Sequence, residues 1–184
     1  MKEEGLKKFS LYPNEFHFLF IGNGYLRKGL DKLLLGLSQL KNEAFHLSVI
    51  GKDNQMDLYR AKAVQLGLKD KVHFFGPSQE IRLFYQLADS LVIPSFYDPF
   101  ANVTVEALAM GLFVISSKLN GGYEILTPTN GAVIEDLLSP DAMVEALRVA
   151  LKNKKTKESA QRIRNSVKYL DFSNQLRILM GSCG

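Results

Sequence analysis

A repeated pattern, a short apolar segment followed by a stretch with helical spacing, constrains this fold most. The apolar segments are 16–21, 46–50, 71–75, 90–93, 112–115 and 131–134. The first four end directly before a glycine or a proline, which marks a turn. Their residues are mostly apolar rather than alternating, as expected for strands covered on both faces. The sequence therefore predicts an α/β fold with a doubly wound parallel sheet and right-handed crossovers.

Helices are expected between these strands. In 30–40 the leucines recur with a spacing that places them on one helical face. The other expected helices are 57–66, 80–88, 103–110 and 142–151, and a weaker one is expected over 172–180. We therefore predict an α/β domain, 1–154, and a C-terminal helical appendage, 155–184.

Composition narrows the class of protein. The 184 residues are 46% hydrophobic and 23% charged, which is typical of a globular domain. The single Cys183 excludes an internal disulfide, and no apolar run approaches the roughly 18–20 residues of a membrane-spanning helix. With no signal-peptide pattern, a reducing, cytoplasmic setting is expected. No spacing suggests a metal site, and three residues are expected to be packed in strands: His17, His46 and His73.

The net charge of +4 is unevenly distributed. Segment 152–168 holds seven lysines and arginines against one glutamate, so the rest of the chain is slightly acidic. A nucleic-acid binder is often basic throughout, and we expect no nucleic-acid partner. The basic segment has two interpretations. A solvated helix is favoured, and peripheral contact with an anionic membrane surface is the alternative.

In doubly wound sheets, ligands bind beyond the carboxyl ends of the strands. The first candidate site there is the turn that contains Gly22 and Gly24, followed by Arg27 and Lys28 at the expected start of a helix. Glycines let a backbone approach a ligand, and a helix N-terminus favours an anion. A plain tight turn with two solvated cations remains the alternative.

The second candidate site joins Asp98 in a loop to Glu106 in the following helix. Asn102 is a plausible N-cap, which would leave the amides of Val103 and Thr104 free for a phosphate. The Glu106 carboxylate could accept hydrogen bonds from a pair of sugar hydroxyls. An Asx turn at Asp98 and a surface acid at Glu106 are equally consistent with the spacing.

The third candidate site is the glycine pair Gly121 and Gly122, again between a strand and a helix. Paired glycines permit close approach of a ligand, although a turn alone would also need them. Gly51 and Gly76 end two further strands at the same expected edge of the sheet.

In this order the sites resemble the C-terminal half of the family 4 retaining glycosyltransferases, which have the Rossmann-like GT-B fold. Lys28-Gly29 matches the family's Lys-Gly, 106–115 matches its Glu-Ala-x-Ala-x-Gly-x-Pro-Val-Ile with Phe113 in place of proline, and 121–125 matches a Gly-Gly-x-x-Glu-Ile element. The resemblance covers about residues 10–155. The family usually has a glutamate at the position of Asp98. The segment Asp98-Pro99-Phe100, with a following asparagine, is similar to the bacterial lipopolysaccharide core glucosyltransferases.

The resemblance implies a role for each candidate residue. Arg27 and Lys28 would neutralise the leaving diphosphate, helped by the amides of 102–104. Glu106 would hold the ribose hydroxyls, and Asp98 would face the donor sugar. The loops from Gly51 to Asp53 and from Gly76 to Ser78 would cradle the base. The implied donor is a UDP-sugar, with glucose favoured, and no cofactor is required.

The resemblance also implies partners. The acceptor would be a lipopolysaccharide-core or other cell-surface glycan, bound by an N-terminal domain that this chain lacks, so the chain alone is expected to be inactive. Two other classes stay open. A non-catalytic nucleotide-binding module would bind without turnover even beside a partner domain, and a UDP-sugar epimerase of related fold would need no acceptor.

Overall fold

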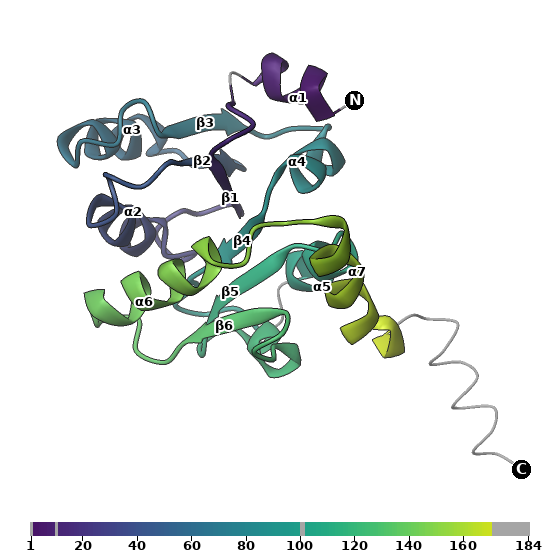
Figure 1. Ribbon diagram of the computed structural model, residues 1–184. Helices are drawn as coiled ribbons and strands as arrows, with labels where there is room; N and C mark the ends of the chain where they lie inside the picture. The colour runs from purple at the N-terminus through teal and green to yellow at the C-terminus, as the bar shows by residue number, and fades with distance from the viewer. Residues whose placement is uncertain (1, 10, 100–101, 171–184) are drawn as a thin grey trace, which may run out of the picture.

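The computed structural model describes residues 2–9, 11–99 and 102–170, and Figure 1 shows one central sheet flanked by helices. All strand pairs are parallel, in the order β3-β2-β1-β4-β5-β6. The predicted doubly wound α/β fold is therefore confirmed, including the sixth strand. The strands are β1 Phe16–Ile21, β2 Phe45–Ile50, β3 Val72–Gly76, β4 Ser90–Ile93, β5 Phe113–Ser117 and β6 Gly131–Ile134.

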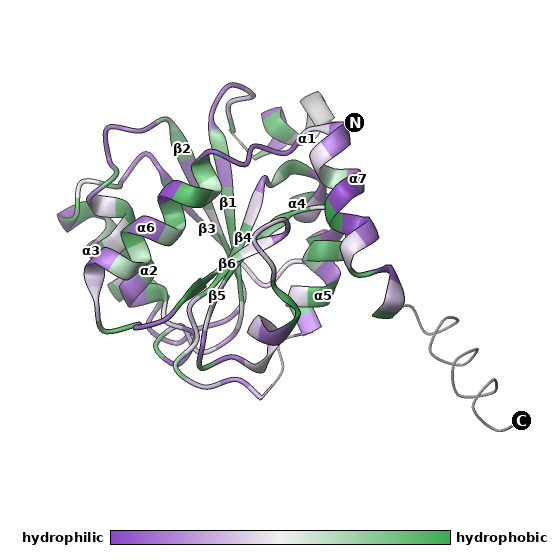
Figure 2. Ribbon diagram, turned by 60° about the horizontal axis from the view of Figure 1, so that its bottom comes forward, coloured by the Kyte–Doolittle hydropathy of each residue, from purple (hydrophilic) through white to green (hydrophobic). Residues whose placement is uncertain are grey.

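Helices cover both faces of this sheet. They are α1 Lys2–Lys8, α2 Leu30–Ser38, α3 Met56–Gln65, α4 Ile81–Leu87, α5 Asn102–Ala109, α6 Pro140–Leu151 and α7 Lys157–Ser166, with short 3-10 turns at η1 Gly121–Ile125 and η2 Lys168–Leu170. Figure 2 shows α2, α3 and α6 on one side of the sheet and α1, α4, α5 and α7 on the other. The strands are thus enclosed, which explains why their apolar residues run without alternation.

The core lies between the sheet and its helices. All six residues of β2 are buried, and the predicted leucine face of α2 packs inward. Burying a leucine side chain is worth roughly 1.5–3 kcal/mol. Gly36 allows α6 to approach α2, because a Cβ atom there would lie 2.4 Å from Met143 Cγ.

Helix α1 was not predicted from the sequence. It packs against α4, where Leu6, Leu11 and Leu87 form a small buried cluster. The segment KEEGLKK has no long apolar periodicity, so only this tertiary contact explains its helical conformation.

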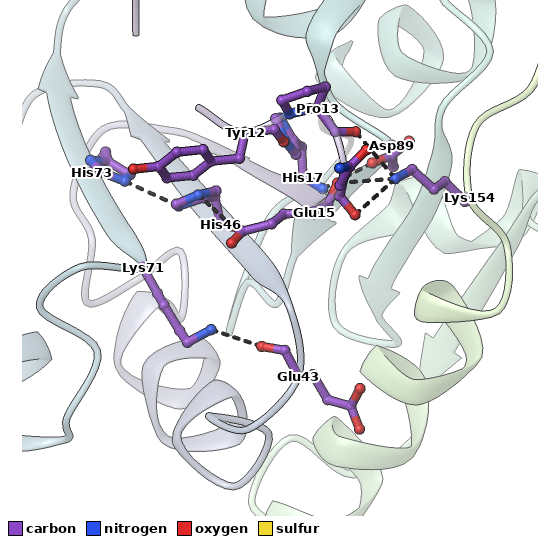
Figure 3. Close-up of polar contacts among 11 residues, drawn as sticks. Tyr12, Pro13, Glu15, His17, Glu43, His46, Lys71, His73, Asp89 and Lys154 are labelled. Carbon is purple, nitrogen blue, oxygen red and sulfur yellow. Dashed lines mark hydrogen bonds and ion pairs between the residues drawn. The ribbon is translucent and has the colours of Figure 1, made fainter. Parts of the chain in front are cut away.

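The three histidines lie together at the amino ends of β1, β2 and β3, opposite the predicted functional edge (Figure 3). His46 Nδ1 and His73 Nε2 are 3.2 Å apart, and His17 Nε2 lies 2.8 Å from the carbonyl oxygen of Tyr12. The Glu15 carboxylate approaches His46 Nε2. Burial lowers the pKa of His46 to about 4 and also lowers the pKa of His73. Within the described ranges, no group of three or more His, Cys, Asp or Glu residues is placed to hold a metal ion.

Two lysines of the basic segment form hydrogen bonds to backbone carbonyl oxygens elsewhere in the chain. The Lys154 ammonium donates to the carbonyl oxygens of residues 13–15 at 3.3–3.5 Å (Figure 3). The Lys155 ammonium donates to the carbonyl oxygen of Tyr85 at 2.9 Å. Helix α7 then turns Ala160 and Ile163 inward. The segment is therefore part of the packed structure as well as a charged surface.

The described residues contain no helix long and apolar enough to cross a membrane. The helix expected over 172–180 lies outside the described residues. The division of the chain at residue 154 stays a prediction.

Candidate functional site

The chain order places a crevice between β1 and β4. These strands are neighbours in the sheet, yet their following helices, α2 and α5, lie on opposite faces (Figure 2). The loops after β1 and β4 must therefore diverge, and such a switch point is where doubly wound sheets bind ligands. The first two candidate sites lie in these two loops.

The first loop differs from the prediction in one respect. Helix α2 begins only at Leu30, so Arg27 and Lys28 lie in the turn before the helix and not at its start. Gly29 ends this turn with φ 74°, a left-handed conformation. A Cβ atom at Gly29 would lie 1.8 Å from the carbonyl oxygen of Pro94, so only glycine lets the two loops meet.

A charged cluster bridges the two loops. The Lys28 ammonium forms an ion pair with Asp98 Oδ2, and both side chains are only 12% exposed. Arg27 Nη1 lies 3.9 Å from the same oxygen and donates to the carbonyl oxygen of Tyr97 at 2.8 Å. Two cations thus share one carboxylate, which leaves one positive charge in excess. Such a site favours an anionic ligand.

Asp98 also joins the third candidate loop. Its carbonyl oxygen accepts a hydrogen bond from the Gly121 amide at 2.9 Å. In that loop, Asn120 Oδ1 accepts from the Gly122 amide at 3.0 Å. A Cβ atom at Gly122 would lie 2.6 Å from Thr104 Oγ1, so this glycine lets the loop rest on α5. The structure therefore brings all three candidate loops together around Asp98.

The glycines that end β1, β2 and β3 lie side by side. The Gly51 amide donates to the carbonyl oxygen of Gly76 at 2.9 Å. A Cβ atom at Gly51, which has φ 128°, would lie 2.1 Å from the carbonyl oxygen of Gly22. Next to them is a cavity of about 470 Å³ lined by Asn23, Gly24, Lys52, Asp53, Asn54 and Gln55. It is large enough for part of a small-molecule ligand.

Tyr25 and Asp53 shape this edge. Asp53 lies in a loop that was predicted to cradle the base, whereas no role was predicted for Tyr25. Asp53 Oδ2 accepts from the Tyr25 amide at 2.6 Å, and the buried Tyr25 hydroxyl donates to the carbonyl oxygen of Gly51 at 2.9 Å. Burial, reinforced by the Asp53 charge, raises the pKa of Tyr25 to about 12. The hydroxyl therefore stays a donor and fixes the loop.

The start of α5 differs slightly from the prediction. Asn102 is the first residue of the helix and not a cap before it. Asn102 is exposed, Val103 is half-buried, and Thr104 is buried. Among the described residues, Thr104 Oγ1 finds no hydrogen-bond partner.

Glu106 lies on α5 and does not join the Lys28–Asp98 cluster through any described contact. Its Oε2 atom accepts a hydrogen bond of 2.7 Å from the hydroxyl of Tyr85 on α4. Burial, together with this hydrogen bond, raises the pKa of Tyr85. Tyr85 was not predicted as a site residue. A tyrosine on the buried side of a helix is a usable signal, because its hydroxyl needs a polar partner.

Comparison with known proteins identifies the family. The family model described as glycosyl transferases group 1 matches residues 1–169. The chain is 31% identical over 137 residues to the lipopolysaccharide glucosyltransferase WaaG of Escherichia coli strain K12, covering 72% of this chain and 36% of that protein. The crystal structure of WaaG matches with a TM-score of 0.78 and 26% identity, covering 93% of this chain and 46% of that one.

Two further solved structures share the fold. The C-terminal domain of the Francisella tularensis protein LpcC matches with a TM-score of 0.74 and 22% identity, covering 91% of both chains. Anabaena HepE in complex with UDP matches with a TM-score of 0.79 and 19% identity, covering 100% of this chain and 52% of that one. The chain thus spans about half of WaaG and HepE in their solved structures.

These matches confirm the resemblance that the motifs predicted. The chain is similar in sequence to lipopolysaccharide glycosyltransferases, and its fold is that of the GT-B structures. The chain belongs to the glycosyl transferases of group 1.

Proposed function

We propose that this chain binds a UDP-hexose, with UDP-glucose favoured, as the donor half of a retaining family 4 glycosyltransferase. The observation that carries the proposal is the pair of cations, Arg27 and Lys28, held at the switch point around the single carboxylate of Asp98. The negative charge of a diphosphate would balance the excess positive charge of this site. HepE, which has the same fold, was solved with UDP.

The proposed mechanism is electrostatic. Arg27 and Lys28 stabilise the negative charge that builds on the leaving diphosphate, the kind of contribution that is usually the largest in such transfers. The amides of 102–104 assist them. Glu106 accepts hydrogen bonds from the ribose hydroxyls, and Asp98 faces the donor sugar. The loops at Gly51 and Gly76, beside the 470 Å³ cavity, hold the base.

Transfer requires an acceptor domain. The WaaG and HepE structures are about twice as long as this chain, which supports a second domain that binds a lipopolysaccharide-core or other cell-surface glycan. The 184-residue chain alone therefore binds donor without turnover. We place the reaction in the cytoplasm. Exposed cations of the basic segment, such as Arg162 and Arg164, are available to an anionic membrane.

The test is calorimetric binding of UDP to the wild-type chain and to Lys28→Ala. Loss of a charged contact to the diphosphate is expected to weaken binding by about tenfold to one hundredfold. Lys71→Ala is the matched control, because Lys71 lies at the opposite, amino edge of the sheet, where its ammonium donates to the carbonyl oxygen of Glu43 at 2.7 Å. Unchanged affinity in Lys28→Ala would refute the diphosphate role.

A second experiment separates the classes of protein. The chain is incubated with UDP-glucose alone and then with a separately produced acceptor domain and a lipid-linked acceptor. Transfer only in the complete mixture is the expected result. Isomerised sugar without an acceptor would identify an epimerase, and binding without turnover in the complete mixture would identify a non-catalytic module.

A further inference from the structure

The hydrogen bond between Tyr85 and Glu106 connects the interior of the protein to an exposed carboxylate. Tyr85 is 4% exposed, whereas Glu106 is exposed on the second turn of α5. The Tyr85 hydroxyl donates to Glu106 Oε2 at 2.7 Å, a typical distance for a bond to a charged acceptor. An exposed glutamate normally samples several rotamers, and this one has a fixed partner.

The donor is fixed by its surroundings. Tyr85 packs in the main core beside Phe84, and its backbone carbonyl oxygen accepts from the Lys155 ammonium at 2.9 Å. The Lys155 amide in turn donates to Asp89 Oδ1 at 3.1 Å, and Asp89 is buried. The α6–α7 connection thus anchors the end of α4. A tyrosine has only two side-chain torsions, so burial leaves its hydroxyl little freedom.

The fixed donor leaves acceptor capacity on the carboxylate. A carboxylate has about four lone-pair positions on its two oxygens, and Tyr85 occupies one of them. The remaining positions can accept two hydroxyls of a vicinal diol. Because ordering a free glutamate side chain costs conformational entropy, a carboxylate already oriented binds such a diol more tightly.

We infer that Tyr85 is a positioning residue that orients Glu106 for the two ribose hydroxyls of the nucleotide donor. The inference rests on the proposed function and adds a residue from a helix, α4, that carries none of the family motifs recognised in the sequence. It predicts that Tyr85 affects ligands that present both hydroxyls more than ligands that present one. A purely structural tyrosine would affect all ligands alike.

The test compares calorimetric binding of UDP and 2′-deoxy-UDP to the wild-type chain, Tyr85→Phe and Glu106→Gln. Tyr85→Phe keeps the ring and removes only the hydroxyl. It is expected to weaken UDP binding by about threefold to tenfold and 2′-deoxy-UDP binding clearly less, because that ligand presents only one of the two hydroxyls. Glu106→Gln should remove most of the preference for UDP. Tyr12→Phe, on an exposed tyrosine at the amino edge of the sheet, is the control.

Two results would overturn the inference: a Tyr85→Phe variant that binds UDP as well as wild type does, or one that loses affinity for both ligands equally. Failure of the proposed function has a different signature. In that case the wild-type chain would not bind UDP, or would not distinguish it from 2′-deoxy-UDP, and the role of Tyr85 would fall with that of Glu106.

Discussion

The buried imidazole of His46 predicts a specific loss of stability in mild acid. His46 is 3% exposed, stacks on Tyr12, and approaches His73 and Glu15 (Figure 3). Burial is the main cause of its lowered pKa. The Glu15 charge acts in the opposite direction, and the nearby His73, His17 and Lys71 act in the same direction as burial.

The magnitude follows from the two pKa values, 6.5 in the unfolded chain and about 4 in the folded one. Above pH 6.5 the ring is neutral in both states, so its full contribution to stability is present. Between these values only the unfolded chain takes up the proton, so the free energy of unfolding falls as the pH falls. At about 1.4 kcal/mol per pKa unit, the loss from His46 is about 3 kcal/mol. That is a large share of a stability of about 5–15 kcal/mol.

Urea unfolding of the wild-type chain and His46→Phe across this pH range measures the effect. The aromatic ring is retained in the variant and the titration is removed, so the difference between the two curves isolates His46 from the carboxylates. The wild-type chain should lose about 3 kcal/mol more than the variant between about pH 7 and pH 4. Parallel curves would show that the burial argument is wrong.

Three further predictions concern single contacts, each measured by urea unfolding. Gly29→Ala should lower the free energy of unfolding by clearly more than the roughly 1–2 kcal/mol that an alanine in a left-handed conformation costs, because its Cβ would clash with Pro94. Gly24→Ala, with φ 73° and open space around it, should cost only that amount. Equal losses in the two variants would contradict the clash at Gly29. Asp89→Asn should cost about 1–3 kcal/mol, because the buried carboxylate accepts hydrogen bonds from two backbone amides, those of His17 and Lys155, and a change within error would count against this. Thr156→Ala should cost about 1 kcal/mol by removing the N-cap of α7, and an unchanged midpoint would count against the cap.

Local patterns carried most of the fold prediction. Strands that end at Gly22, Gly51 and Gly76 were recognisable because burial on both faces demands continuous apolar residues and the following turn demands glycine. Boundaries shifted by a residue or two where hydrogen bonding continues beyond the apolar run, as at Ser116 and Ser117 in β5. Helix α1 escaped prediction because its stability comes from contact with α4.

The sequence predicted which residues form the candidate site better than it predicted their contacts. Arg27, Lys28 and Asp98 stood out because they follow strands whose carboxyl ends must meet at one edge. The leucine pattern placed α2 correctly from residue 30, but Arg27 and Lys28 were wrongly assigned to its start, because the left-handed Gly29 ends a separate turn first. Tyr85 was missed because it and Glu106 are 21 positions apart in the chain and lie on different helices, so no spacing within either helix reveals their hydrogen bond.

The two outer strands of the sheet bear on how this protein avoids aggregation. An open edge strand presents unpaired amides and carbonyls that can recruit a strand from another molecule. Here one edge, β6, has only four residues and begins with glycine. The other edge, β3, follows Lys71, and its pairing with β2 shifts register between Val49 and Ile50. Short length, a flanking lysine and an irregular register each make an edge a poor template. The sheet therefore ends in strands that discourage edge-to-edge growth without needing closure into a barrel.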